Sequence, residues 1–270
     1  MAFKISGFGA SEEVVDTTLP APIQQIITPQ KSLVQVYFPN RNQTLTYFND
    51  QFDLKLGDVV FVDGKLENER GIVREISKNF KIKISDYKRV ISVADTEISG
   101  SVYIADSHFI SFKPTVISYP KIRSWVLPPV KEEEEYETGY DDASFFLDKL
   151  FDMNVSATVF ERGREYFIDN RVTYLEINAD HGKAIVEGEL AYEIEFDYLA
   201  GEIKRLTCTC PCGYTCKHEV ATMLQLREIL EIIEGNYADE YRQTGYFAAV
   251  AKGAFFSLVL NRKKTGCFTL

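Results

Sequence analysis

The segment from Cys208 to His218, with the sequence CTCPCGYTCKH, constrains the fold of this chain more than any other segment does. It contains four of the five cysteines and one of the three histidines of the 270-residue chain. The spacing is C-x-C, then five residues, then C-x-H. Cysteine sulfur and histidine nitrogen are the donors that a structural zinc ion takes in tetrahedral geometry. The sequence therefore predicts one structural Zn²⁺ held by Cys208, Cys210, Cys216 and His218.

The residues on either side predict a strand that enters this site and a helix that leaves it. Residues 201–207 read as a turn followed by a strand. Alternate strand residues point the same way, so Cys208 and Cys210 can face one ion. From Lys217 onward, apolar residues recur near a period of 3.6, which is typical of a helix. Thr215 is the expected N-cap of that helix.

Other uses of these cysteines fit the spacing less well. A disulfide between Cys208 and Cys210 would have poor geometry. A redox C-x-x-C motif is absent, and a catalytic Cys–His pair needs one nucleophile rather than a cluster. A catalytic zinc keeps one position for water, whereas four protein ligands fill the tetrahedron. Cys212 is the surplus thiol, expected in the loop without a ligand, although the spacing also allows it to replace Cys210.

The pattern C-x-C…C-x-H, followed by a helix with the sequence CKHEVATML, resembles the SWIM zinc finger. That family occurs in bacterial Swi/Snf-type ATPases and in Mutator-type transposases. Residues 160–172, FERGREYFIDNRV, are similar to the opening that precedes bacterial SWIM fingers, and residues 188–210 resemble their strand pair. The resemblance covers about residues 155–235. It implies a structural zinc and a role linked to a Swi/Snf-type ATPase or to DNA.

The whole chain predicts an α+β protein of two domains, of which residues 1–128 form the first. From Leu33 onward, short β-branched and aromatic stretches recur about every ten residues, which predicts a small all-β, barrel-like domain of the SH3 or OB type. Residues 98–127 are expected to add strands to it, with Trp125 at its edge. This domain is either a packed domain without a site or a binding barrel. A binding surface would combine aromatic and basic residues: Tyr37, Phe38, Arg41, Tyr47, Phe48, Phe80, Lys81, Lys83, Lys88 and Arg89.

Residues 129–142 contain two prolines, an acidic run and a glycine, which predicts a linker. Residues 143–270 are then expected to form the zinc-finger domain, with an antiparallel sheet and flanking helices. Its first two helices are predicted over 143–153 and 156–169. Three or four strands should follow, ending in the metal ligands. Residues 246–260 have a sequence typical of a helix, and a short basic stretch comes after them.

The charge distribution counts against broad nucleic-acid binding. The net charge is −10, and residues 131–160 contain two basic and nine acidic residues. Neither half of the chain has the basic excess that is usual for a nucleic-acid-binding domain. If the finger contacts a nucleic acid or a partner, the expected contacts are the cations around the predicted metal: Lys204, Arg205, Lys217 and Arg227.

These features predict a non-enzymatic zinc-binding module that mediates macromolecular interaction. The partner implied by the resemblance is a Swi/Snf-type ATPase, another protein, or DNA. The alternative is a protein that binds nucleic acid directly through the zinc finger and the N-terminal barrel. No P-loop and no Ser–His–Asp set is recognisable, so no catalytic residues are predicted. The absence of an 18-residue apolar run and of an export signal predicts a cytoplasmic protein that does not contact a membrane.

Overall fold

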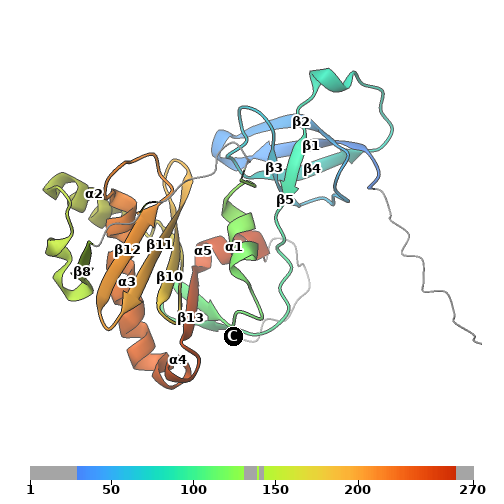
Figure 1. Cartoon of the computed structure of the whole chain (residues 1–270). Helices are drawn as coiled ribbons and strands as arrows, with labels where there is room; N and C mark the ends of the chain where they lie inside the picture. The colour runs from blue at the N-terminus through green and yellow to red at the C-terminus, as the bar shows by residue number, and fades with distance from the viewer. Residues whose placement is uncertain (1–28, 131–138, 140–142, 260–270) are drawn as a thin grey trace, which may run out of the picture.

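The computed structural model describes residues 29–130, 139 and 143–259 (Figure 1). Within these residues the chain is an α+β protein with two antiparallel sheets, of five and eight strands, and five α-helices. In the same part of the chain, no helix has both the length and the apolar character needed to cross a membrane. Residues 1–28, most of the predicted linker and the basic stretch near the C-terminus lie outside the described residues.

The first sheet has the order β2-β1-β4-β3-β5 and is not closed into a barrel, which corrects the barrel-like prediction. Its outer strands β2 and β5 approach each other only at an isolated parallel bridge between Phe48 and Arg89. β3 and β5 have four residues each, and among the described strands no ladder joins β5 to β2. The strands are β1 (Ser32–Phe38), β2 (Gln43–Asn49), β3 (Val59–Val62), β4 (Gly71–Ser77) and β5 (Val90–Val93).

The second sheet has the order β6-β7-β13-β9-β10-β11-β12-β8. It includes two strands from residues 98–127 that the sequence assigned to the N-terminal domain. β7 pairs with β13 near the end of the chain, so the two sheets divide between β5 and β6 rather than near residue 128. The strands are β6 (Val102–Ile104), β7 (Phe109–Phe112), β8 (Ser144–Phe146), β9 (Val172–Asn178), β10 (His181–Glu187), β11 (Ala191–Leu199), β12 (Glu202–Cys208) and β13 (Tyr246–Ala251).

Helix α3 (Lys217–Ile232) covers one face of the eight-stranded sheet, and α2 (Ala157–Ile168) packs against α3. Apolar residues of α3 and of the sheet share one core, which includes Val220, Met223, Leu226, Leu175 and Ile194. The metal-ligand segment lies where β12 ends and α3 begins, so this core fixes both sides of the site.

Helices α1 (Tyr119–Val126) and α5 (Lys252–Val259) lie between the two sheets (Figure 1). They share a core with residues of both sheets, among them Val59, Tyr174 and Ile185. Trp125, expected at a barrel edge, belongs to α1, where it is buried and its Nε1 donates a hydrogen bond to the carbonyl of Asp95 at 2.7 Å. The two sheets are therefore joined by a common apolar layer.

Two predicted helices take other forms. Residues 143–153 form β8 and the 3₁₀ helix Leu147–Asp152 rather than an α-helix. Residues 246–259 form β13 followed by the short helix α5. The helix predicted over 156–169 is confirmed as α2, and the three or four strands predicted before the metal ligands are found as the four strands β9 to β12.

Candidate metal centre

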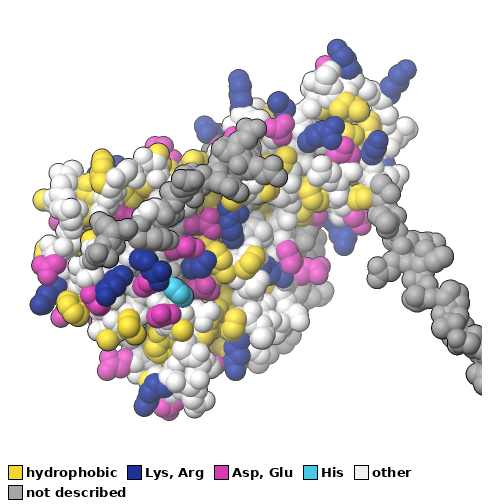
Figure 2. Space-filling view, in the orientation of Figure 1, with side chains coloured by type: hydrophobic (Ala, Val, Ile, Leu, Met, Phe, Trp, Pro, Cys, Tyr) yellow, Lys and Arg dark blue, Asp and Glu magenta, His cyan; other side chains and the backbone are white. Residues whose placement is uncertain are grey.

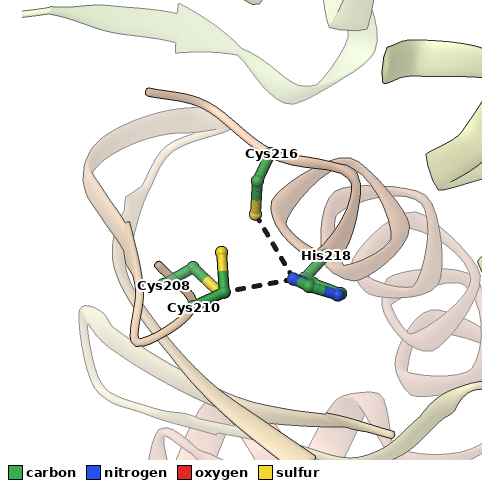
Figure 3. A group of neighbouring side chains, drawn as sticks. All are labelled: Cys208, Cys210, Cys216 and His218. Atoms are coloured by element: carbon green, nitrogen blue, oxygen red, sulfur yellow. Dashed lines mark hydrogen bonds between the residues drawn. The ribbon is translucent and has the colours of Figure 1, made fainter. Parts of the chain in front are cut away.

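Figure 3 shows the side chains of Cys208, Cys210, Cys216 and His218 gathered around one point. One donor atom from each lies within 4.8 Å of the donors of the other three. Nδ1 of His218 is 3.7 Å from Sγ of Cys208 and 3.6 Å from Sγ of Cys216. Cys210, Cys216 and His218 are buried. The chain therefore places the four predicted ligands together in a shielded position.

Two of the distances between these donors match edges of a zinc tetrahedron. A zinc–sulfur bond is about 2.3 Å and a zinc–nitrogen bond is about 2.0 Å, so tetrahedral angles separate sulfur from nitrogen by about 3.6 Å. The two sulfur–nitrogen distances to His218 agree with that value. The group could thus hold a metal ion such as zinc. Four protein donors fill the coordination sphere, as in structural rather than catalytic sites.

The start of α3 positions two of the four ligands. Its N-cap is Cys216 rather than the predicted Thr215. The backbone N–H of Cys216 donates to the carboxylate of Glu219 at 2.6 Å, and the Cys216 side chain accepts from the backbone of that residue. This reciprocal pair is a capping box with cysteine in the place of serine or threonine. His218 then falls in the first helical turn and faces the sulfurs.

The pKa values of the three clustered thiols favour a bound cation. The hydrogen bond from Cys208 lowers the pKa of Cys216 to about 4, and the same pairing together with burial raises the pKa of Cys208. Burial raises the pKa of Cys210 to about 12. Without a positive charge the three neighbouring thiols cannot all ionise, because each new thiolate repels the others. A divalent ion removes that obstacle, and the thiols release their protons when it binds.

Two aromatic rings hold the imidazole of His218. The ring of Tyr192 on β11 is stacked on it, with centroids 4.5 Å apart, and Tyr166 on α2 meets it edge-on at 5.4 Å. Nζ of Lys217 lies 4.4 Å from the centre of the Tyr166 ring. Nε2 of His218 is buried, and within the described residues it has no hydrogen-bond partner. Stacking, rather than a hydrogen bond to the distal nitrogen, therefore fixes the ring.

Gly163 explains why α2 can reach the metal centre. A Cβ atom at this position would lie 2.5 Å from Cβ of Val220 and 2.9 Å from the carbonyl oxygen of Lys217. The glycine allows α2 to cross the first turn of α3 in close contact. Tyr166, three residues further on, then lies against His218.

The sequence predicted a core position for Tyr166, but it did not place Tyr166, Tyr192 or Glu219 at the metal centre. The spacing of Cys216 and Glu219 matches a capping box and was a usable signal for the helix start. Tyr166 lies inside the segment that carried the SWIM resemblance. No local sequence pattern pointed to Tyr192, because only the tertiary fold brings β11 against His218. The surplus Cys212 is exposed and is not part of the four-residue group, which contains Cys210.

The four predicted contact cations lie in separate environments. Nζ of Lys204 is 3.0 Å from Glu202, and Arg205 pairs with Asp197. Lys217 lies over Tyr166 at the start of α3. Arg227 is ten residues further along α3, which is about 15 Å in a helix. It lines a cavity beside Phe146.

Of the ten residues named for a barrel surface, three are buried in the core: Phe38, Tyr47 and Phe48.

Comparisons of the chain with protein-family models, with curated proteins and with solved structures give no match. The fold and the site define an α+β protein with a Cys₃His group that could hold a metal ion such as zinc. No family model and no relative identifies a SWIM domain, so the Cys₃His group is the part of the SWIM expectation that is shown.

Proposed function

We propose that this protein is a non-enzymatic binding module in which a structural zinc ion shapes a surface for another macromolecule. The expected partner is a Swi/Snf-type ATPase. One observation carries the proposal: four protein donors surround one buried point, which leaves no coordination position for a substrate or a water molecule. Zinc bound in this way contributes on the order of 10 kcal/mol to folding in zinc-finger peptides. In this proposal the metal stabilises the shape of the binding surface and takes part in no reaction.

The loop between Cys210 and Cys216 supports a binding role. Both of its ends belong to the ligand group, so a bound ion would fix the loop at both sides. Tyr214 within it is 74 % exposed. A large aromatic side chain on a pre-organised loop is typical of residues that anchor protein interfaces, because little conformational freedom is lost on binding.

The experiment is affinity purification of the tagged protein from its native lysate, with the recovered proteins identified by mass spectrometry. A Swi/Snf-type ATPase should be recovered with the wild type, and Tyr214→Ala should reduce its recovery without loss of zinc. Leu199→Ala, at another exposed apolar residue (68 %), is the matched control and should leave recovery unchanged. If no such ATPase is recovered, or if both variants recover it equally well, the proposed partner or the proposed surface is wrong.

A second candidate is direct nucleic-acid binding, and one segment favours it. Residues 78–89 join β4 to β5 and contain five basic residues and one acidic residue. Lys78, Lys81 and Lys83 are exposed. This part of the molecule projects away from the eight-stranded sheet, and dark blue side chains stand at its rim (Figures 1 and 2). Such a segment suits contact with the phosphates of a single strand.

This candidate is tested by fluorescence anisotropy with a labelled oligothymidine over a range of salt concentrations. The variant with Lys78→Glu, Lys81→Glu and Lys83→Glu should weaken the complex and reduce the slope of log K against log salt by about 0.7 for each lost phosphate contact. Lys204→Glu is the control for the zinc-finger side of the molecule. If no complex forms at low salt, or if Lys204→Glu has the larger effect, residues 78–89 are not the contact.

A further inference from the structure

A cavity of about 290 Å³ lies beyond the C-terminal end of α3, away from the metal centre. It is formed where the turn Ile233–Tyr237 and helix α4 (Ala238–Thr244) pass over the edge of the eight-stranded sheet. Half of its lining residues are aromatic: Tyr103, Phe112, Tyr237, Tyr241, Tyr246 and Phe247. Its volume is close to the lower end of small-molecule sites, about 300 Å³, so its ligand must be small.

Two of these rings, Tyr237 and Phe247, pack edge to face rather than stacked. The rings of Tyr237 and Phe247 lie 5.1 Å apart with their planes at 63°. Tyr237 is held in place by its hydroxyl, which donates to the carbonyl of Ile104 at 3.3 Å. Tyr237 is the last residue of a π-helical turn, an element found often at functional sites. Phe112 and Phe247 are buried, whereas Tyr103 is 45 % exposed.

One acidic and one basic residue stand among the residues that line the cavity. Glu240 lines it, and Lys113 is the one basic residue among the described residues of its lining, with Nζ 3.4 Å from Glu240. Burial raises the pKa of Tyr237, and the carboxylates of Glu240 and Asp106 raise it further. The pKa of Tyr246 is raised by burial and then by Glu176. Of the three carboxyl groups that act on these rings, Glu240 lies in the lining itself, and Asp106 and Glu176 lie outside it.

We propose that this cavity binds an organic ammonium ion of the methylated or quaternary type. The negative faces of aromatic rings attract such a cation, and quaternary ammonium groups are recognised by cages of rings. Glu240 supplies the carboxylate of the lining, and its present partner Lys113 is a 60 % exposed side chain that an incoming cation can displace. The source of the ammonium group is either a free small molecule of the choline type or a methylated lysine side chain of another protein. This site is independent of the metal centre, so its failure would leave the proposed zinc module untouched.

The test is isothermal titration calorimetry on the full-length protein with choline and with its neutral isostere 3,3-dimethylbutan-1-ol. The two molecules have the same shape and differ in charge. Choline should bind at least about tenfold more tightly, since cation–π attraction grows when the cation is desolvated. Equal binding of both would mean a merely apolar pocket and would overturn the proposal, as would no binding of choline at millimolar concentration.

Two variants locate the site. Glu240→Gln, at a half-exposed side chain, should remove most of the preference for choline over the isostere. Glu234→Gln, at an exposed residue outside the cavity lining, is the matched control and should preserve it. A trimethyllysine peptide that binds more tightly than choline identifies a protein as the source, and the reverse order identifies a small molecule. If both variants behave alike, the cation does not bind in this cavity.

Discussion

The imidazole of His218 is stacked on the phenol ring of Tyr192, with ring centroids 4.5 Å apart and planes at 27°. Tyr192 belongs to β11, and His218 belongs to the first turn of α3. The contact therefore links a metal ligand directly to the eight-stranded sheet. Because Nδ1 of the same imidazole faces the sulfurs, the orientation that Tyr192 imposes on the ring is the orientation that a metal needs.

Replacing Tyr192 by leucine should weaken zinc binding while the four donors stay in place. Loss of the ring contact costs about 1 kcal/mol in aromatic pairs, which is about a fivefold loss of affinity. Tyr192→Phe keeps the ring and should bind zinc like the wild type. Competition with a chromophoric chelator measures both. Equal affinities for the leucine and phenylalanine variants would mean that stacking does not orient His218.

Cys208→Ser should remove stoichiometric zinc and destabilise the eight-stranded sheet with α3. The serine leaves three of the four donors, and zinc binding is part of the folding free energy in such sites. Cys212→Ser is the matched control, because Cys212 is exposed and outside the ligand group. Elemental analysis of protein purified without chelators, with thermal unfolding, tests both. Retention of zinc by Cys208→Ser would contradict the ligand set, and loss of zinc in Cys212→Ser would mean that Cys212 takes the place of Cys210 as a ligand.

Gly163→Ala should destabilise the protein by about 1–3 kcal/mol, the usual cost of overpacking. The new methyl group would meet Val220 and the carbonyl of Lys217, so α2 must move away from α3. Tyr166 on α2 would then lose its contact with His218. Gly253→Ala, in α5, is the control because nothing lies within 4 Å of its added Cβ. It should be neutral or stabilising by up to about 1 kcal/mol. Urea unfolding of both variants gives the comparison, and equal stabilities would contradict close packing at Gly163.

The metal group and its flanking elements could be predicted because their signals are local. Donor spacing, strand alternation and helical periodicity all lie within about 70 residues, from α2 to α3. The position of β13 could not be predicted in this way. Five of its six residues are buried, because the cores on both faces of the sheet use them, so the segment lacks the alternation that marks a half-exposed strand. A continuous apolar run of this kind reads equally well as a helix.

The division between the sheets was missed for a related reason. β6 and β7 are followed in sequence by α1 and the acidic segment, but β7 pairs with a strand about 140 residues later. No local pattern encodes such a pairing. Barrel closure likewise depends on whether two distant edge strands meet. Here Phe48 and Arg89 meet at a single bridge, which alternation within each strand does not reveal.

Glu176 should make the protein less stable as pH rises through the carboxyl range. The residue is buried on β9, and burial raises its pKa above the ordinary value of 4.5, although the hydrogen bond from Tyr174 at 2.6 Å partly opposes the shift. The folded state thus holds this proton more tightly than the unfolded state does. Its contribution to stability is complete below pH 4.5 and is lost as the pH rises through the raised pKa of the folded protein.

Glu176→Gln should therefore flatten the pH dependence and make the variant relatively more stable at neutral pH. The amide oxygen can still accept the hydrogen bond from Tyr174, while the side chain can no longer ionise. Glu195→Gln is the matched control, since Glu195 is about half exposed and pairs with Lys183, whose charge also acts on Glu176. Urea unfolding at a series of pH values compares the two slopes. If both variants change with pH like the wild type, Glu176 is ionised in the folded protein at its ordinary pKa, and the carboxylate rather than the acid accepts the tyrosine hydrogen bond throughout.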